Sequence, residues 1–323
     1  MNRLERSDLE MTVERKAWHG VLVANPLALD EHLSIDFDRY AEHIRWLAES
    51  GCDGITPNGS LGEYQTLSDD ERARVVRTAV EAAPDGFSVI PGIGAYGALQ
   101  AARWANQAAE AGASAVMALP PNSYRADERS VVDHFSAVAS VGLPVIAYNN
   151  PLDTKVDLTP RLLAKLHGEG LIVAVKEFAG DPRRAYALLE QAPTIDALIG
   201  SDDTVLEIAL AGAKGWIAGY ASVFPRACVA LYRAAVGHDI ERALTLYRAL
   251  HPLLRWDSKT EFVQAIKLSM DIVGRNGGTC RPPRVPLNEA DEAEVRALTE
   301  RFVASGLESG GAAGTTGRTA AVG

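Results

Sequence analysis

Short apolar runs alternate with amphipathic stretches along most of this chain. From about Trp18 onward the runs lie roughly 25 to 35 residues apart, which is the spacing of repeated βα units. Each run is short and rich in branched aliphatic residues, as in a strand buried on both faces of a sheet. Between the runs, apolar positions recur with helical spacing. The pattern therefore predicts a parallel sheet covered by helices.

Eight runs qualify as strands, and most are joined by a helical stretch. The predicted strands are 20–25, 54–57, 88–93, 115–119, 144–149, 172–177, 197–200 and 215–218. The predicted helices between them are 36–50, 68–83, 98–111, 128–140, 159–167, 182–191 and 204–211. Ser68 and Glu71 have the spacing of a capping box, so a helix should begin at this serine. Three glycines, Gly51, Gly112 and Gly142, mark helix ends.

Eight such units favour a closed (β/α)8 barrel over an open doubly wound sheet. The open alternative lacks its usual fingerprint, because residues 20–26 contain one glycine and no GxGxxG pattern follows the first strand. Further helical periodicity follows the eighth strand, at 226–236, 240–254, 259–273 and 289–305. We interpret these stretches as the eighth barrel helix and a C-terminal helical extension. The expected organisation is an N-terminal extension (1–17), a catalytic barrel (18–236), a helical domain (237–305) and a disordered tail (306–323).

Composition narrows the classes of function. The 323 residues carry a net charge of −10 and a pI near 5.3, and no basic block occurs, which argues against nucleic-acid and acidic-membrane partners. No apolar run approaches the roughly 18 residues that a membrane span needs, and the charged N-terminus does not resemble a signal peptide. The 3 cysteines are widely spaced without a CxxC pair, so neither a disulfide framework nor a zinc site is predicted. We expect a cytoplasmic protein.

The sixth predicted strand ends on a lysine. Five apolar residues precede Lys176, and the chain turns soon afterwards at Gly180. The C-terminal ends of barrel strands are where active sites lie. Apolar surroundings lower the pKa of a lysine, and a neutral lysine can attack a ketone to form an imine that acts as an electron sink. Lys176 is therefore a candidate nucleophile, with a lysine that merely reaches solvent as the alternative.

Other strand ends add polar groups to the same mouth. The second strand leads into the glycine turn, residues 59–63, whose backbone N–H groups and Ser60 hydroxyl suit a carboxylate. Tyr148 ends the fifth strand, where a phenol can transfer protons near an imine. We expect Lys176, Tyr148 and Ser60 to be catalytic. The residues expected to bind substrate are Gly59, Leu61, Asn122, Asn149, Asp153, Ser201 and Ile217. The polar members among them could instead serve turns or helix caps.

Three motifs occur in order: Gly59-Ser60-Leu61-Gly62-Glu63, Tyr148-Asn149-Asn150-Pro151 and Val175-Lys176-Glu177. With them the chain resembles the dihydrodipicolinate synthase and N-acetylneuraminate lyase superfamily of class I Schiff-base aldolases, from about Trp18 to Phe302. The resemblance implies a (β/α)8 barrel with C-terminal helices, assembled as a homotetramer of paired dimers. It also implies that Lys176 forms an imine with a 2-oxo acid, usually pyruvate, without any cofactor or metal. Tyr148 would be the proton-transfer phenol, and the backbone at Ser60 and Leu61 would hold the carboxylate.

The chain departs from the dihydrodipicolinate synthases at three places. Ser60 and Leu61 stand where those enzymes usually have two threonines. Asp153 stands near the position of an arginine that grips the second substrate, and an acid there would repel a carboxylate. Asn122 occupies the place of a tyrosine that reaches into the neighbouring site. These departures disfavour a role in lysine biosynthesis.

The expected function is a Schiff-base lyase that cleaves, condenses or dehydrates pyruvate or a sugar-derived 2-keto-3-deoxy acid. The alternative is 4-hydroxy-tetrahydrodipicolinate synthase, which joins pyruvate to aspartate semialdehyde. A barrel that binds a metabolite without catalysis is a second alternative. A phosphate-handling barrel would need basic residues after strands seven and eight, which are missing. A metal-dependent aldolase would need histidines at strand ends, whereas most of the histidines here fall in predicted helices or connections.

Overall fold

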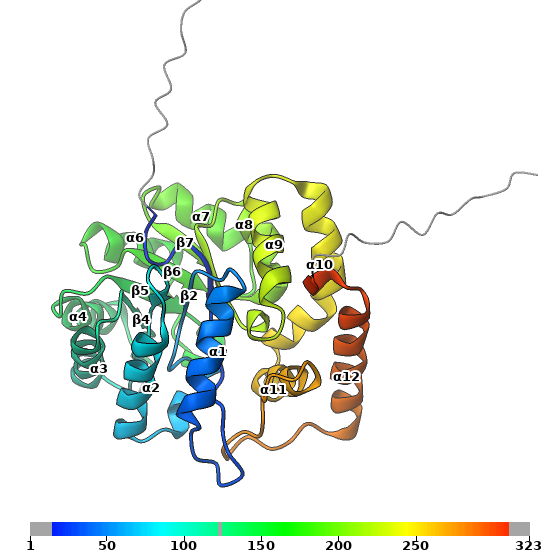
Figure 1. The fold of residues 1–323 in the computed structure, drawn as a ribbon. Coiled ribbons are helices and arrows are strands. Elements are labelled where there is room, and N and C mark those ends of the chain that lie inside the picture. The colour runs from blue at the N-terminus through cyan, green and yellow to red at the C-terminus, as the bar shows by residue number, and fades with distance from the viewer. Residues whose placement is uncertain (1–14, 122–124, 310–323) are drawn as a thin grey trace, which may run out of the picture.

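The computed structural model describes residues 15–121 and 125–309. Most of the predicted N-terminal extension, most of the predicted tail and the candidate residue Asn122 lie outside the described residues. Eight strands form at the predicted places (Figure 1). They are β1 (Gly20–Val23), β2 (Gly54–Ile55), β3 (Ser88–Val89), β4 (Val116–Ala118), β5 (Val145–Asn149), β6 (Ala174–Glu177), β7 (Asp196–Ile199) and β8 (Gly215–Ala218).

All strand pairs are parallel, and the sheet curls back on itself. The order is β3-β2-β1-β8-β7-β6-β5-β4, so β3 and β4 end the row of paired strands. Beyond these strands the backbones still meet, because Gly92 and Met117 form a parallel bridge and Ser114 N donates to Val89 O at 2.9 Å. This is the arrangement expected of a (β/α)8 barrel. The ladder of β3 ends earlier than predicted because Pro91 has no N–H to donate.

Helices cover the outer face of the sheet. Those between strands are α1 (Phe37–Glu49), α2 (Asp69–Ala82), α3 (Ala98–Ala111), α4 (Glu128–Ala139), α5 (Pro151–Thr154), α6 (Pro160–Gly168), α7 (Arg183–Gln191) and α8 (Val205–Leu210). The predicted capping box starts α2, since Ser68 Oγ accepts from Glu71 N and Glu71 accepts from Ser68 N. The short helix α5 was not predicted; Asn150 caps it and Pro151 occupies its first turn.

Within the described residues, four short 3-10 helices lie in connections and a fifth follows the last helix. They are η1 (Tyr64–Thr66), η2 (Asp202–Thr204), η3 (Tyr220–Ser222), η4 (Arg255–Ser258) and η5 (Leu307–Ser309). After β8 come α9 (Pro225–Val236), α10 (Ile240–Leu254), α11 (Phe262–Ile272) and α12 (Glu289–Ala304). Figure 1 shows α10, α11 and α12 together on one side of the curled sheet. The C-terminal helical extension that the sequence predicts is therefore present.

Apolar side chains fill both the inside and the outside of the curled sheet. The inner cluster contains residues from several strands, among them Leu22, Met117, Ile146, Leu198 and Ile217. Tyr148 belongs to the same inner cluster, and it is the register partner of Lys176 on the neighbouring strand. Since paired residues of parallel strands point to the same face, both side chains belong to the interior.

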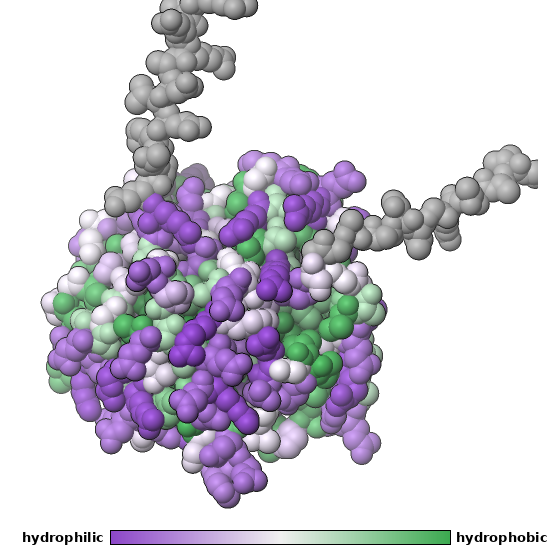
Figure 2. Space-filling model, in the orientation of Figure 1, coloured by the Kyte–Doolittle hydropathy of each residue, from purple (hydrophilic) through white to green (hydrophobic). Residues whose placement is uncertain are grey.

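The outer surface is mainly polar where it can be seen. Figure 2 shows hydrophilic side chains over most of the face that α1 and α2 present, with hydrophobic residues gathered beside α12. Among the described helices, none combines the length and the apolar character needed to cross a membrane.

Candidate active site

A cavity of about 660 Å³ opens at the C-terminal ends of the strands. Lys176, Tyr148 and Ser60, the three residues predicted to be catalytic, all line it. The structure thus brings together side chains from β6, β5 and the loop after β2. The predicted substrate-binding residues that also line it are Gly59, Leu61, Asp153 and Ile217.

Two other predicted substrate-binding residues lie outside the cavity wall. Asn149 follows Tyr148 on β5, and because side chains alternate along a strand it points to the opposite face. Its side chain donates to Glu177 at 3.0 Å and accepts from Leu158 N at 2.9 Å. Ser201 is buried at the end of β7, and its backbone carbonyl accepts from Thr204 N.

Lys176 is buried without a polar partner. Its side chain is only 6% exposed, and Nζ lies 4.4 Å from the centre of the Tyr148 ring and 5.7 Å from that of Phe178. Among the described residues, none forms a hydrogen bond or ion pair with Nζ. Burial lowers the pKa of Lys176, while the carboxylates of Asp257 and Asp202 act in the opposite direction. The amine is therefore biased toward the neutral, nucleophilic form.

Gly200, at the end of β7, provides the space that Lys176 occupies. A Cβ atom at this position would lie 2.3 Å from Glu177 O and 3.1 Å from Lys176 Cγ. Any side chain here would displace the end of β6 together with the lysine. Glycine is thus required by close packing against the strand that carries the nucleophile.

Tyr148 is held at its hydroxyl by the residue that caps α5. Asn150 Nδ2 donates to Tyr148 Oη at 3.3 Å and to Asp153 Oδ2 at 2.8 Å. The ring meets Phe178 edge to face, with centroids 6.3 Å apart. Burial raises the pKa of Tyr148, so the phenol keeps its proton at neutral pH.

The glycine turn presents backbone donors to the cavity. Glu63 N donates to Ser60 O at 3.1 Å, but the N–H groups of Ser60 and Leu61 donate to no described backbone carbonyl. Both residues line the cavity, and Glu63 has a positive φ of 50° that completes the turn. Two free N–H groups beside a serine hydroxyl suit a carboxylate.

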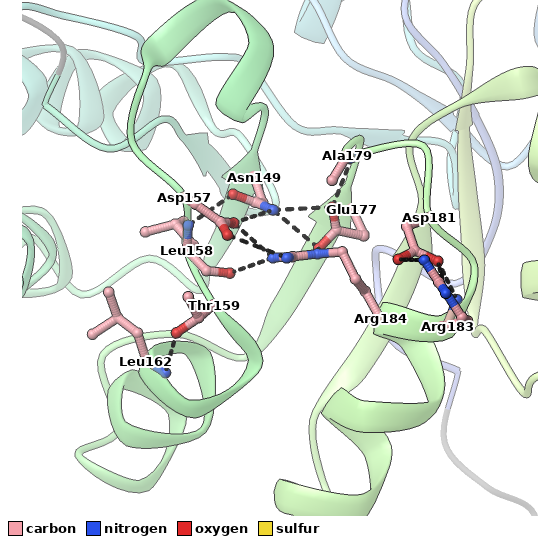
Figure 3. A network of polar contacts seen from close by, with 10 residues as sticks. All are labelled: Asn149, Asp157, Leu158, Thr159, Leu162, Glu177, Ala179, Asp181, Arg183 and Arg184. Carbon is pink, nitrogen blue, oxygen red and sulfur yellow. Dashed lines mark hydrogen bonds and ion pairs between the residues drawn. The ribbon is translucent and has the colours of Figure 1, made fainter.

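A polar network fixes the outward side of β6 (Figure 3). Glu177 accepts from Ala179 N at 2.7 Å and from Arg184 Nε at 3.0 Å, in addition to the Asn149 amide. Arg184 also reaches Asp157 Oδ1 at 2.7 Å. Burial raises the pKa of Glu177, and the charge of Arg184 opposes this effect. Because Glu177 is tied outward, the preceding residue, Lys176, is directed inward.

Two buried charged residues of the cavity wall, Arg72 and Asp257, were not predicted from the sequence. Arg72, on α2, is 6% exposed, stacks on Trp104 with its Cζ 4.3 Å from the ring centre, and donates to Gly94 O at 3.2 Å. Burial lowers the pKa of Arg72 to about 10. Asp257, in η4, is 8% exposed. No local pattern distinguishes either from a surface charge, so only the three-dimensional arrangement reveals them.

Within residues 15–121 and 125–309, no three His, Cys, Asp or Glu side chains lie close enough together to hold a metal ion.

Comparison with known proteins gives consistent matches. Residues 17–302 match the model of the dihydrodipicolinate synthetase family. The 4-hydroxy-tetrahydrodipicolinate synthase of Methanosphaerula palustris is 31% identical over 88% of this chain and 98% of its own. The enzyme of the same name from Anaeromyxobacter dehalogenans is 34% identical over 83% and 92%.

Solved structures agree with the sequence matches. Dihydrodipicolinate synthase from Aquifex aeolicus superposes with a TM-score of 0.85 at 27% identity, covering 88% of this chain and 98% of that one. A prophage protein of the same family from E. coli K12, solved in complex with pyruvate, gives 0.82 at 26% identity, covering 88% and 98%. Members of this family are lyases of the aldolase type. The chain therefore belongs to the dihydrodipicolinate synthetase family.

Proposed function

We propose that this protein is a Schiff-base lyase that acts on a 2-oxo acid through an imine on Lys176. The observation that carries the proposal is a buried lysine that has no polar partner among the described residues and lies against the Tyr148 ring in a cavity of about 660 Å³. A lysine held only for stability would be expected to pair with a carboxylate or a carbonyl, since an unpaired buried ammonium is costly. Its neutral form is the one that attacks a ketone.

Each remaining part of the site has a role in this proposal. The free N–H groups of Ser60 and Leu61 bind the carboxylate of the 2-oxo acid and set its carbonyl carbon before Lys176. The protonated imine at C2 of the 2-oxo acid then withdraws electrons from the substrate. A bond to C4 can therefore break or form while an enamine holds the electron pair. Tyr148 transfers a proton to or from the substrate oxygen on C4.

Two observations bear on the second half of the reaction. Asp153 lines the cavity beside Asn150, and an acid there opposes a carboxylate on an incoming substrate. We therefore favour cleavage or dehydration of a hydroxylated 2-oxo acid. The alternative, 4-hydroxy-tetrahydrodipicolinate synthase, is favoured by the names of the curated relatives at about 30% identity.

Reductive trapping tests the proposal. The protein is incubated with pyruvate, reduced with borohydride and mapped by peptide mass spectrometry beside Lys176→Ala. We expect an adduct on Lys176 that is absent from the variant. The second buried lysine, Lys267, serves as an internal control and should remain unmodified. Folded protein without an adduct on Lys176, with pyruvate and with larger 2-oxo acids, would contradict the imine mechanism.

Activity assays distinguish the two reactions that could follow imine formation. Consumption of 2-keto-3-deoxy sugar acids supports the lyase that we favour. Robust condensation of pyruvate with aspartate semialdehyde would instead support the synthase and defeat the argument from Asp153.

A further inference from the structure

Asp257 reaches the cavity from the C-terminal part of the chain. It lies in η4, between α10 and α11, and lines the same cavity as Lys176. Its carboxylate rests against the backbone at the end of β8, where a Cβ atom on Gly219 would lie 2.5 Å from Asp257 Oδ1. Glycine at this position thus lets an acidic group from outside the eight strands approach the end of the sheet.

The surroundings of Asp257 differ from those of the neighbouring buried acid, Asp202. The Asp202 carboxylate accepts from Trp216 Nε1 at 2.9 Å, from Tyr220 N at 2.8 Å and from Gly219 N at 3.1 Å. Asp257 accepts one hydrogen bond, from Asp202 N to Oδ2 at 3.3 Å. Within the described parts of the chain, Oδ1 of Asp257 has no donor. Asp202 therefore ties β7 to β8, whereas Asp257 has a free oxygen at the cavity.

The charges around Asp257 come from several elements. Burial raises the pKa of Asp257, the Asp202 and Asp203 carboxylates raise it further, and Lys176 lowers it. From α11, Lys267 is engaged by Glu63 rather than by Asp257. The other titratable groups that sense its charge are the phenols of Tyr148 and Tyr220. Since burial acts on Lys176 in the opposite sense, the acid and the amine compete for one proton.

We propose that Asp257 moves the proton that imine formation requires, a step that rests on the proposed function of Lys176. Its carboxylate takes a proton from the Lys176 ammonium through water in the cavity that both residues line, and the neutral amine adds to the C2 carbonyl of the 2-oxo acid. An N–H proton of the adduct passes to the former carbonyl oxygen, which gives the neutral carbinolamine. The protonated Asp257 then donates to the carbinolamine hydroxyl as the C–O bond breaks. The products are the iminium, one water molecule and the Asp257 carboxylate. The positive charge of the Lys176 ammonium is thus carried by the iminium, and no net proton is taken up.

A carboxyl group suits this step better than the phenol nearby. Efficient acid catalysis needs a pKa close to the working pH. Burial raises the pKa of Asp257 from the usual range of a carboxyl group, which lies below the working pH, and raises that of Tyr148, which already lies above it. The Asp257 carboxylate also remains as counter-ion to the iminium, which holds a positive charge in a buried site. Tyr148 is then left for the later proton transfer at the substrate oxygen.

The pH profile of imine formation gives the test. The active form of the pair holds one proton: at low pH both groups are protonated and no free amine exists, and at high pH the amine is free but no acid remains. The wild type should therefore show a bell-shaped dependence of the initial trapping rate with pyruvate and borohydride. Asp257→Asn should slow this rate by about 10²–10⁴-fold and should remove the alkaline limb, since the acid is lost and the remaining buried carboxyl, Asp202, is engaged by Trp216, Gly219 and Tyr220.

Matched variants separate this role from a structural one. Asp257→Glu keeps the acid and should retain the alkaline limb. Glu261→Gln removes an acid from the same segment without touching the cavity wall and should leave rate and profile unchanged. An alkaline limb that survives in folded Asp257→Asn, or that is lost in folded Asp257→Glu, would overturn the inference. No adduct in the wild type would overturn the proposed function itself, and the inference with it.

Discussion

Two buried lysines lie near the mouth of the curled sheet, and their surroundings are opposite. Lys267, on α11, is 1% exposed and donates to Glu63 Oε1 at 2.7 Å and to Thr279 O at 2.7 Å. Lys176, on β6, is 6% exposed and faces two aromatic rings without a hydrogen bond to any described residue. The Lys267 ammonium is held by a carboxylate and a carbonyl, whereas the Lys176 amine faces the cavity.

The difference separates a structural lysine from a reactive one. Glu63 closes the glycine turn, and its second carboxylate oxygen accepts from Arg281 N at 2.8 Å, so the C-terminal segment holds the turn from outside. At Lys176 the carboxylates of Asp257 and Asp202 act through space and raise the pKa of the amine. Burial without a partner lowers the pKa of a lysine, and such a group serves catalysis rather than stability.

Replacing the reactive lysine should give the largest change. Lys176→Met removes the nucleophile and should lower turnover of a 2-oxo acid substrate by more than about 10³-fold. Because the ammonium has no partner, its loss should leave the free energy of unfolding unchanged or raise it. Steady-state kinetics and denaturant unfolding of the same preparation measure both effects. A strong loss of stability would show that Lys176 has a partner after all.

Replacing the structural lysine should do the reverse. Lys267→Met leaves the buried Glu63 carboxylate without its cationic partner and Thr279 O without its donor, and the free energy of unfolding should fall by about 3–5 kcal/mol. Adding Glu63→Gln to this variant removes the stranded charge and should restore part of the loss, a coupling that a double-mutant cycle measures. Equal and additive losses in the two single variants would contradict the pairing.

The contrast between the lysines marks what the sequence could reveal. Eight strands and most helices followed from hydrophobic spacing, because burial on two faces imposes short apolar runs. Lys176 was found because it ends such a run, which in a closed sheet places it at the active edge. Lys267 lies within a helix, where one lysine among apolar residues resembles a side chain that reaches solvent.

Other parts of the site depend on contacts between distant segments. Asp257 and Arg72 reach the cavity from η4 and α2. No residue next to either of them in the sequence indicates that it lines a cavity. Asn149 was expected at the cavity, but the alternation of side chains along β5 places it outside, in contact with Glu177. Strand ends can be predicted one at a time, whereas the direction of each side chain depends on register.

A smaller effect should come from the network behind β6. Arg184→Met removes the charged partner of Glu177, which keeps its bonds from Asn149 and Ala179. Hydrogen bonds to charged groups contribute about 1.5–3 kcal/mol each, so stability should fall by roughly this amount. The end of β6 should also loosen, with a slower trapping rate at Lys176 but an unchanged pH profile. A shift of that profile would show that Glu177 takes part in the titration of the site.

The smallest effect should come from the ion pair of Arg281 and Glu71. It lies at the solvent-exposed edge of the contacts that join Lys267, Glu63 and Arg281. Glu71 accepts from Arg281 Nη2 at 2.6 Å, with the two side chains 30% and 15% exposed. The hydrogen bond from Arg281 lowers the pKa of Glu71 from 4.5 to about 2. Because the folded pKa is the lower one, the pair stabilises the fold fully above pH 4.5, and this contribution is lost as the pH falls toward 2.

Glu71→Gln isolates this charge, because glutamine still serves as the third residue of the capping box with Ser68. Solvent screens the pair, so the variant should lose less than about 1 kcal/mol at pH 6, and the difference from the wild type should shrink at pH 3 and in high salt. Thermal unfolding at the two pH values measures it. A difference that stayed constant would mean that the side chain acts through its shape rather than its charge. A loss as large as that of Lys267→Met would contradict the distinction between the buried pair and its solvated edge.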